Sequence, residues 1–188
     1  MPSRIISVMS SSKTVDHADY CLRLGRSLTE LGASVVLVDA AFDAELTQML
    51  GVNPEQQPGV TAMLASQEEC DAEQFVLKNF ALVPSDRKML DLEEACEKLC
   101  LNIGRAMVHP LQQLSRQYTF VIIDAANHRS ELSAIAAMGA SDLTVLLELR
   151  PDLQGDVNTV LALFNSQLKT IRNISPEALA QKLYAGSI

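Results

Sequence analysis

The chain has 188 residues, enough for one domain with a sizeable core, and 48 % hydrophobic against 20 % charged residues exclude an intrinsically disordered protein. The 15 lysines and arginines against 23 aspartates and glutamates give a net charge of −8, which argues against sequence-independent DNA binding because that function needs a basic face. No run of about 18 or more apolar residues occurs, so we expect no membrane-spanning segment.

Five short apolar runs have the length and composition of buried strands. The run SVVLVD is apolar up to its final aspartate, as is typical of a parallel sheet covered on both faces. The runs predict strands over residues 5–9, 34–39, 80–84, 120–124 and 143–149.

Apolar residues at helical spacing fill most of the chain between these runs. Gly32 and Gly51 mark the expected ends of two helices, and Pro110 marks an expected break or kink in a longer one. The pattern predicts helices over residues 15–31, 40–51, 60–66, about 90–117, 130–138, 152–170 and 176–184.

Strands that alternate with helices predict an α/β fold in a single domain over residues 1–188, with a doubly wound, mainly parallel sheet flanked by helices. Ligands of such sheets bind beyond the carboxyl ends of the strands. Asp39, Asp124 and the turn Ser10–Lys13 fall at that edge, which is therefore the candidate functional site. The alternative is that each aspartate only caps a turn or the next helix.

Six segments follow one another in the order and spacing of a known family. They are ISVMSSSK, LTELGASVVLVDAAFDAELTQMLGV, PGVTAMLAS, FALVPSD, YTFVIIDAAN and ASDLTVLLELRPD. Together they resemble the ParA/MinD-type deviant-Walker P-loop ATPases, and most closely the cytoplasmic kinase domains of the bacterial tyrosine kinases that control capsule and exopolysaccharide export. The resemblance covers about residues 3–170 and implies a P-loop NTPase-like fold.

The residues that bind phosphate in that family are replaced in this chain. The family's Gly-x-Gly-Lys-Ser/Thr falls on Thr14–Ala18, which we interpret as a degenerate Walker A motif. Val15 disfavours the positive φ that a loop glycine supplies, and Ala18 lacks the hydroxyl that binds Mg²⁺. We expect His17 to be mostly neutral and too short to replace the lysine. We expect Asp16 to supply its own negative charge at the helix start and to repel a triphosphate. The vestigial phosphate loop then consists of Ser11, Ser12, Lys13, Thr14, Asp16, His17 and Ala18.

Two acidic positions of the family remain. Asp39 begins its second acidic motif, in which Ala41 replaces the partner acid, and Asp124 keeps the Walker B aspartate. Because Mg²⁺ binds through few carboxylates plus substrate phosphate, we treat both aspartates as vestigial and expect no catalytic residue, no metal and no ATP cofactor. Lys13 is a candidate replacement for the missing lysine, with a solvated surface lysine as the alternative.

The resemblance also implies a further strand and a tyrosine-rich tail after the helix over 152–170. We expect neither, because the residues that follow are mostly polar with a helical pattern, and Tyr184 is the single tyrosine among them.

We therefore predict a pseudo-ATPase or pseudokinase that acts as a regulatory or scaffolding module in exopolysaccharide or capsule synthesis and export. The resemblance implies a cytoplasmic homodimer or homo-oligomer that docks on the cytoplasmic segment of a membrane polysaccharide co-polymerase or a related assembly protein, which recruits it to the inner membrane. We expect no nucleic-acid partner. Two alternatives stay open: an active but divergent ATPase or tyrosine kinase that uses Lys13, Asp39 and Asp124 with ATP and Mg²⁺, and a partition- or Min-like positioning protein of a pilus or flagellar system.

The remaining candidate ligands form no metal motif. Cys96 and Cys100 lie four residues apart on one helix face but lack two further ligands. We interpret all the cysteines as reduced thiols: Cys21, Cys70, Cys96 and Cys100. We expect His109 to be exposed or capping at the helix break, and His128 and Arg129 in the edge loop to be solvated or to contact a partner.

Overall fold

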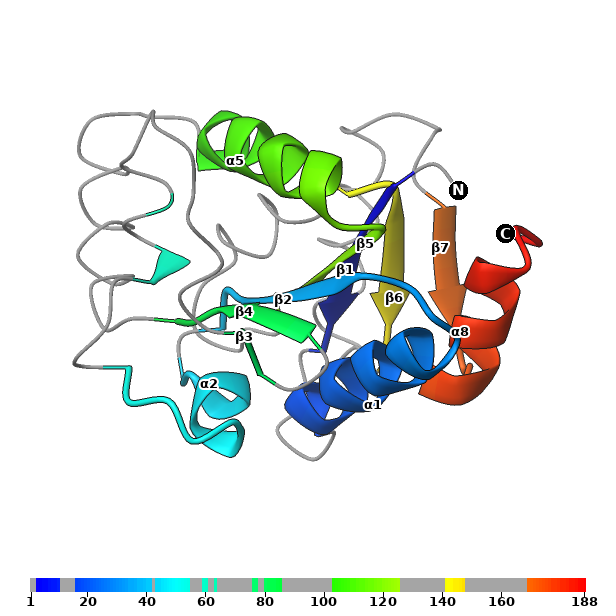
Figure 1. The fold of residues 1–188 in the computed structure, drawn as a ribbon, viewed down its shortest axis with the longest axis horizontal. Coiled ribbons are helices and arrows are strands. Elements are labelled where there is room, and N and C mark those ends of the chain that lie inside the picture. The colour runs from blue at the N-terminus through cyan, green and yellow to red at the C-terminus, as the bar shows by residue number, and fades with distance from the viewer. Residues whose placement is uncertain are drawn as a thin grey trace, which may run out of the picture.

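The computed structural model describes one continuous sheet with helices on both faces (Figure 1). The described residues are 3–10, 16–41, 43–54, 59–60, 63, 76–77, 80–85, 103–125, 141–147 and 169–188. Within them the strands are β1 (Arg4–Met9), β2 (Val35–Asp39), β3 (Val76–Leu77), β4 (Phe80–Val83), β5 (Phe120–Asp124), β6 (Leu143–Leu146) and β7 (Lys169–Arg172). The helices are α1 (His17–Glu30), α2 (Glu45–Met49), α5 (Ile103–Gln117) and α8 (Pro176–Tyr184).

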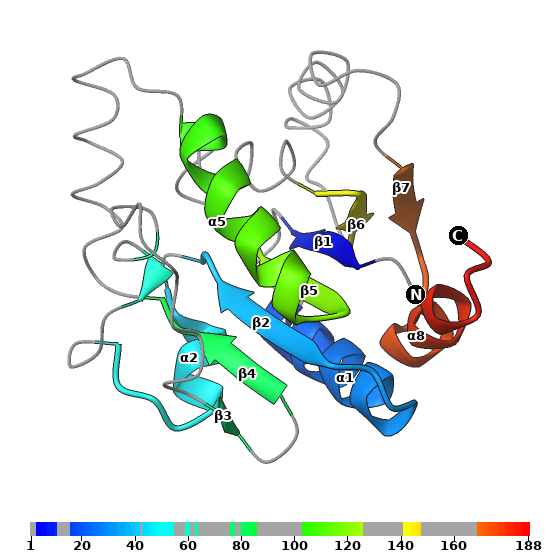
Figure 2. The same ribbon diagram turned by 45° about the horizontal axis from the view of Figure 1, so that its top comes forward.

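The seven strands lie in the order β3-β4-β2-β5-β1-β6-β7. Every neighbouring pair is parallel except β3 and β4, which are antiparallel. Helix α5 covers one face of the sheet, and α1 and α8 lie side by side over the other (Figures 1 and 2). This arrangement confirms the predicted α/β doubly wound fold.

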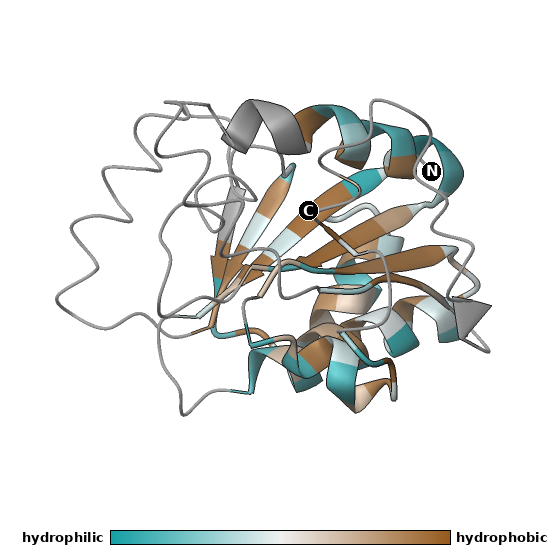
Figure 3. Cartoon of the chain, turned by 90° about the vertical axis from the view of Figure 1, so that its left-hand side faces the viewer, coloured by the Kyte–Doolittle hydropathy of each residue, from teal (hydrophilic) through white to brown (hydrophobic). Residues whose placement is uncertain are grey.

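The core lies between the sheet and its covering helices. Every residue of β2 and of β5 is buried, as the continuous apolar runs predict. Figure 3 shows these strands as apolar bands, with the hydrophilic residues of α5 turned away from them. Helix α1 packs closely on β2 at Gly25, where an added Cβ would lie 3.0 Å from the Leu37 side chain.

Two glycines end helices where the sequence predicts. Gly32 has a φ of +91° just after α1 and donates its N–H to the carbonyl of Thr29. Ala33 donates to the carbonyl of Leu28, so the last turn of α1 is closed in the manner of a Schellman motif. Gly51 has a φ of +76° after α2, which is shorter than the pattern over 40–51 suggests.

Of the predicted break or kink at Pro110, the break is wrong, because α5 runs through this residue from Ile103 to Gln117. A proline inside a helix removes one backbone hydrogen bond, but the fully buried Leu111 and Leu114 anchor the following turn. His109 is exposed, as expected, but it lies inside the helix and not at a helix end.

Two strands lie outside the predicted apolar runs: the two-residue β3, which pairs with β4, and β7. Residues 169–172 form β7, which pairs with β6 in parallel, so the prediction of a helix to residue 170 and of no further strand is wrong there. This edge strand contains no apolar run that would predict it, because three of its four residues are polar or charged: Lys169, Thr170 and Arg172. The following helix is α8, with the predicted bounds 176–184 and Ser175 as its N-cap.

Several predictions fall outside the described residues, wholly or for the most part, and stay predictions. They concern residues 11–13 of the turn Ser10–Lys13, most of the helix over 60–66, the part of the helix over about 90–117 before residue 103, the helix over 130–138, and the helix over 152–170 up to residue 168. They also concern Cys70, Cys96, Cys100, His128 and Arg129. Cys21 is a free thiol buried in α1, and its burial raises its pKa well above the ordinary value. Among the described helices, none has both the length and the apolar character that a membrane crossing requires.

Candidate functional site

The two aspartates that end strands lie side by side at the carboxyl edge of the sheet. Asp39 and Asp124 are register partners between β2 and β5, and β1 pairs with β5 so that Val8 lies opposite Asp124. Both aspartate residues are fully buried. Buried carboxylates need hydrogen-bond or ion-pair partners, and the two find different ones.

Asp39 is held by donors that follow it closely in the chain. Its Oδ1 accepts from the N–H of Ala41 at 3.1 Å, and its Oδ2 accepts from the N–H and the hydroxyl of Thr47 at 2.8 and 2.6 Å. The Thr47 hydroxyl in turn accepts from the N–H of Ser85 at 2.9 Å. Burial and the nearby charge of Asp124 raise the pKa of Asp39, against the effect of these hydrogen bonds.

Asp124 is held by His17, the first residue of α1. The Nδ1 atom of His17 lies 2.9 and 3.0 Å from the two carboxylate oxygens of Asp124. Because a carboxylate can only accept, Nδ1 carries the hydrogen and donates it. Burial alone lowers the pKa of His17, but the hydrogen bond and charge of Asp124, with the charges of Asp43 and Glu45, outweigh it and raise the pKa to about 9.

The structure therefore corrects the expectation for His17. Its side chain reaches Asp124 and is buried with it, and with a pKa of about 9 it carries a positive charge near neutral pH. The expectation of a neutral histidine used the pKa of an exposed imidazole, whereas here a buried anion sets the protonation state.

Asp16 lies at the helix start and places its own negative charge there, as expected, whereas its repulsion of a triphosphate stays a prediction. It is the N-cap of α1, its side chain is exposed, and its Oδ1 accepts from the N–H of Asp19 at 2.7 Å. The residue of the motif that occupies the buried edge is His17, not Asp16. Ala18 is fully buried in the first turn of α1. The other loop candidates, Ser11, Ser12, Lys13 and Thr14, lie outside the described residues.

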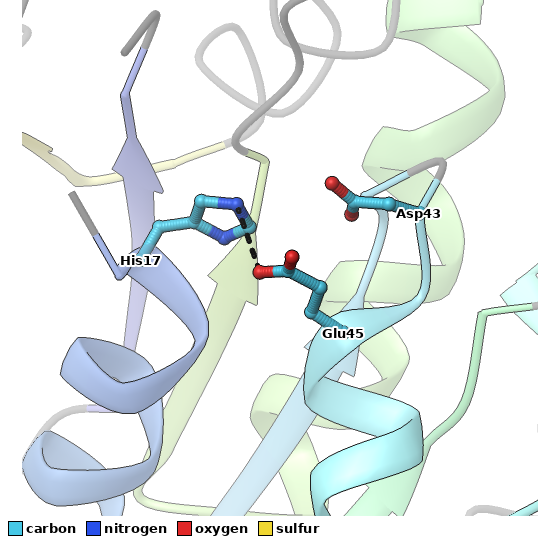
Figure 4. A group of neighbouring side chains, drawn as sticks. All are labelled: His17, Asp43 and Glu45. Carbon is cyan, nitrogen blue, oxygen red and sulfur yellow. Dashed lines mark ion pairs between the residues drawn. The ribbon is translucent and has the colours of Figure 1, made fainter. Parts of the chain in front are cut away.

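Two acidic residues that the sequence analysis did not select also approach His17. Asp43 and Glu45 come from the connection after β2 and from the first residue of α2, and both side chains point toward the His17 ring (Figure 4). The Oε2 atom of Glu45 lies 3.8 Å from Nε2 of His17. Both residues follow the end of β2 within six positions, so the rule that places sites at this edge could have found them.

A sequence model of the AAA domain family matches residues 3–174 of this chain. Among proteins of curated function, none matches the sequence significantly. Solved structures with a similar fold do exist. Cobyrinic acid a,c-diamide synthase from Mycobacterium smegmatis with ADP and magnesium has a TM-score of 0.77 at 18 % identity, over 99 % of this chain and 82 % of that chain.

Two further solved structures have similar scores. Apo McdA from Cyanothece has a TM-score of 0.72 at 19 % identity, over 99 % of this chain and 83 % of that chain. A plasmid partition protein from Borrelia burgdorferi has a TM-score of 0.72 at 18 % identity, over 90 % and 78 %. At such identities the likeness shows a common fold. Because the family match spans most of the chain, the protein belongs to the AAA domain family, and it has the fold of these solved structures.

Proposed function

We propose that this protein is a non-hydrolysing relative of the ParA/MinD-type ATPases and that it acts as a protein-binding module. The observation that carries the proposal is the buried pair of His17 and Asp124. The resemblance aligns His17 with the lysine that neutralises phosphate charge, and Asp124 with the aspartate that holds Mg²⁺ through water. In this chain the two groups neutralise each other.

The pair opposes binding of a magnesium nucleotide for an energetic reason. A magnesium shell at Asp124 has to displace the His17 ring, which then loses its carboxylate partner. Separating one partner from a buried ion pair typically costs about 3–5 kcal/mol. Ala18 offers no hydroxyl to the metal in return. These positions support structural use of the former site better than catalysis.

The alternative of an active, divergent ATPase needs Lys13, Asp39 and Asp124 to be available. Both oxygens of Asp39 already accept hydrogen bonds from Ala41 and Thr47, and both oxygens of Asp124 face His17. Two proteins with the same fold contain ATP, its analogue or ADP in their solved structures. The absence of ATP and magnesium from this protein thus stays a prediction, and nucleotide titration is its test.

For the partner we propose a second copy of this chain together with a cytoplasmic segment of a membrane assembly protein, with a polysaccharide co-polymerase as the candidate from the family resemblance. The net charge of −8 supports a protein partner over nucleic acid. The fold likeness to McdA and to a plasmid partition protein supports a positioning role as the second candidate.

Isothermal titration with ATP and with ADP, each in excess Mg²⁺, tests the proposal together with a phosphate-release assay. We expect no saturable heat at millimolar nucleotide and no release of phosphate above the buffer rate. Micromolar binding with turnover that Asp124→Ala or Lys13→Ala abolishes would overturn the proposal. Light scattering after size exclusion should give the same dimer with and without ATP, and a nucleotide-dependent dimer would favour the active ATPase.

A further inference from the structure

One nitrogen of the His17 ring is not used by the pair with Asp124. Nδ1 donates to the Asp124 carboxylate, and Nε2 faces Glu45 at 3.8 Å. Metal-binding histidines in proteins are commonly held in this way by a carboxylate. The carboxylate, here that of Asp124, sets the ring orientation and makes the other ring nitrogen a better metal ligand.

Two carboxylates converge on that free nitrogen. One atom each of His17, Asp43 and Glu45 lies within 4.8 Å of the other two (Figure 4). Ligands about 2.0–2.2 Å from one Zn²⁺ lie ~3.4 Å apart in a tetrahedral site. Small rotations therefore suffice to close the site, chiefly of Glu45, whose side chain is 54 % exposed and free to turn.

The Asp43 carboxylate supplies an independent observation. Its Oδ1 atom is buried, and within the described part of the chain no hydrogen-bond donor reaches it. A buried carboxylate oxygen without a donor is costly, so such atoms are rare in folded proteins. A cation bound between this oxygen, Glu45 and Nε2 of His17 would satisfy it.

We propose that His17, Asp43 and Glu45 bind a divalent transition-metal cation through Nε2 and one oxygen of each carboxylate. The imidazole nitrogen favours Zn²⁺ and similar ions over Mg²⁺, which prefers oxygen ligands alone. Two carboxylates neutralise the charge of the cation, and three protein ligands leave a fourth position for water. Asp124 is then the outer partner of the ligating histidine and does not itself touch the metal.

The cation site is distinct from a nucleotide-bound magnesium site at Asp124, and it does not depend on the proposed loss of ATP hydrolysis. The backbone of the metal-binding connection is also held without the metal. Gln48 donates its side-chain amide to the Asp43 carbonyl at 2.8 Å, and Ala44 adopts a left-handed φ of 54° between the two acids.

Calorimetric titration of the chelator-stripped, full-length protein with Zn²⁺ at mildly alkaline pH tests the proposal, since Zn²⁺ has to displace the proton on Nε2 of His17. We expect one Zn²⁺ site that excess Mg²⁺ does not displace. Loss of an outer-shell partner alone costs about 10- to 100-fold in metal affinity, so Glu45→Gln and Asp43→Asn should each weaken binding by at least ~10-fold. The matched control is Glu30→Gln, an exposed acid at the far end of α1, which should leave the affinity unchanged.

Titration with Co²⁺ separates this site from the cysteines. The absorption spectrum should show nitrogen and oxygen ligation without a thiolate charge-transfer band, and Zn²⁺ should displace the Co²⁺. A thiolate band, no binding of Zn²⁺, or equal affinity of the native protein and both acid variants would each overturn the proposal. His17→Ala removes a ligand and breaks the buried pair, so Glu45→Gln and Asp43→Asn decide the outcome.

Discussion

Two buried aspartates end neighbouring strands, and the protein holds them by different means. Asp39 and Asp124 are register partners with no exposed surface. The donors to Asp39 are neutral groups 2 and 8 residues further along the chain. The donor to Asp124 is a cationic ring from 107 residues earlier in the sequence. One aspartate thus organises a local turn, and the other joins β5 to the start of α1.

The difference separates a structural from a chemical use of the same residue type. Asp39 stabilises the connection that leads into α2, because its carboxylate oxygens accept hydrogen bonds from backbone and hydroxyl donors there. The Asp124 carboxylate is paired by charge with His17, at the edge of the sheet where we propose that the nucleotide site has been lost. Removing donors from the two aspartates should therefore have effects of different size and different pH dependence.

The largest expected effect is that of His17→Ala, which leaves Asp124 buried without its cationic partner. Breaking a buried pair in this way costs about 3–5 kcal/mol of unfolding free energy, measured by urea unfolding. The matched control is His109→Ala on the exposed side of α5, which should stay within ~0.5 kcal/mol of the native protein. A loss below ~1 kcal/mol for His17→Ala would contradict the buried pair.

The corresponding change at Asp39 is Thr47→Val, because the Thr47 hydroxyl donates to this aspartate. It removes one donor to Asp39 and leaves the buried N–H of Ser85 without its acceptor, so we expect a loss of about 2–3 kcal/mol. Thr47→Ser keeps the hydroxyl and should cost less than ~1 kcal/mol by the same denaturation assay. A loss below ~1 kcal/mol in Thr47→Val would contradict this role of the Thr47 hydroxyl.

The pair should also make stability depend on pH in the metal-free protein. Because the pKa of His17 rises from 6.5 to about 9 on folding, its contribution is complete below about pH 6.5 and is lost as the pH rises through about 9. Allowing for screening by solvent, we expect a loss of roughly 2 kcal/mol across that window. Denaturation over this range in the presence of chelator measures it, and His17→Gln should remove this part of the pH dependence.

The smallest effect is expected at Asp16, which caps α1 on the surface. Asp16→Ala should cost about 1 kcal/mol, and Asp16→Ser should restore most of it, because serine is an equally good N-cap. Neither variant should gain affinity for ATP. If Asp16→Ala binds ATP, then Asp16 and not the His17 pair excludes the nucleotide.

Local chemistry explains which parts of this molecule can be predicted from sequence. The helix end at Gly32 and the helix start at Pro176 are signals that neighbouring residues determine, and the structure confirms them. The buried runs of β2 and β5 are equally visible, because both faces of these strands are covered. Strand β7 is not, because its residues are mostly polar and its pairing depends on β6.

The candidate site also has parts that the sequence predicts and parts that depend on the folded chain. The sequence placed Asp39 and Asp124 at one edge and aligned His17 with the phosphate-binding lysine. The bond between His17 and Asp124 joins residues 107 positions apart, and its effect on the pKa needs the burial that only the folded chain provides. Asp43 and Glu45 were missed because acids after a strand are common, and their convergence on His17 depends on the path of the chain into α2.

The most direct test of this account is a ¹⁵N NMR titration of the His17 ring, assigned with the His17→Gln variant, in the metal-free protein with and without magnesium ATP. We predict that His17 titrates with a pKa of about 9 and that millimolar magnesium ATP changes neither its shifts nor its pKa. A ring that titrates near 6.5, or that leaves Asp124 when the nucleotide is added, would contradict the claim that the His17–Asp124 pair has replaced the nucleotide site.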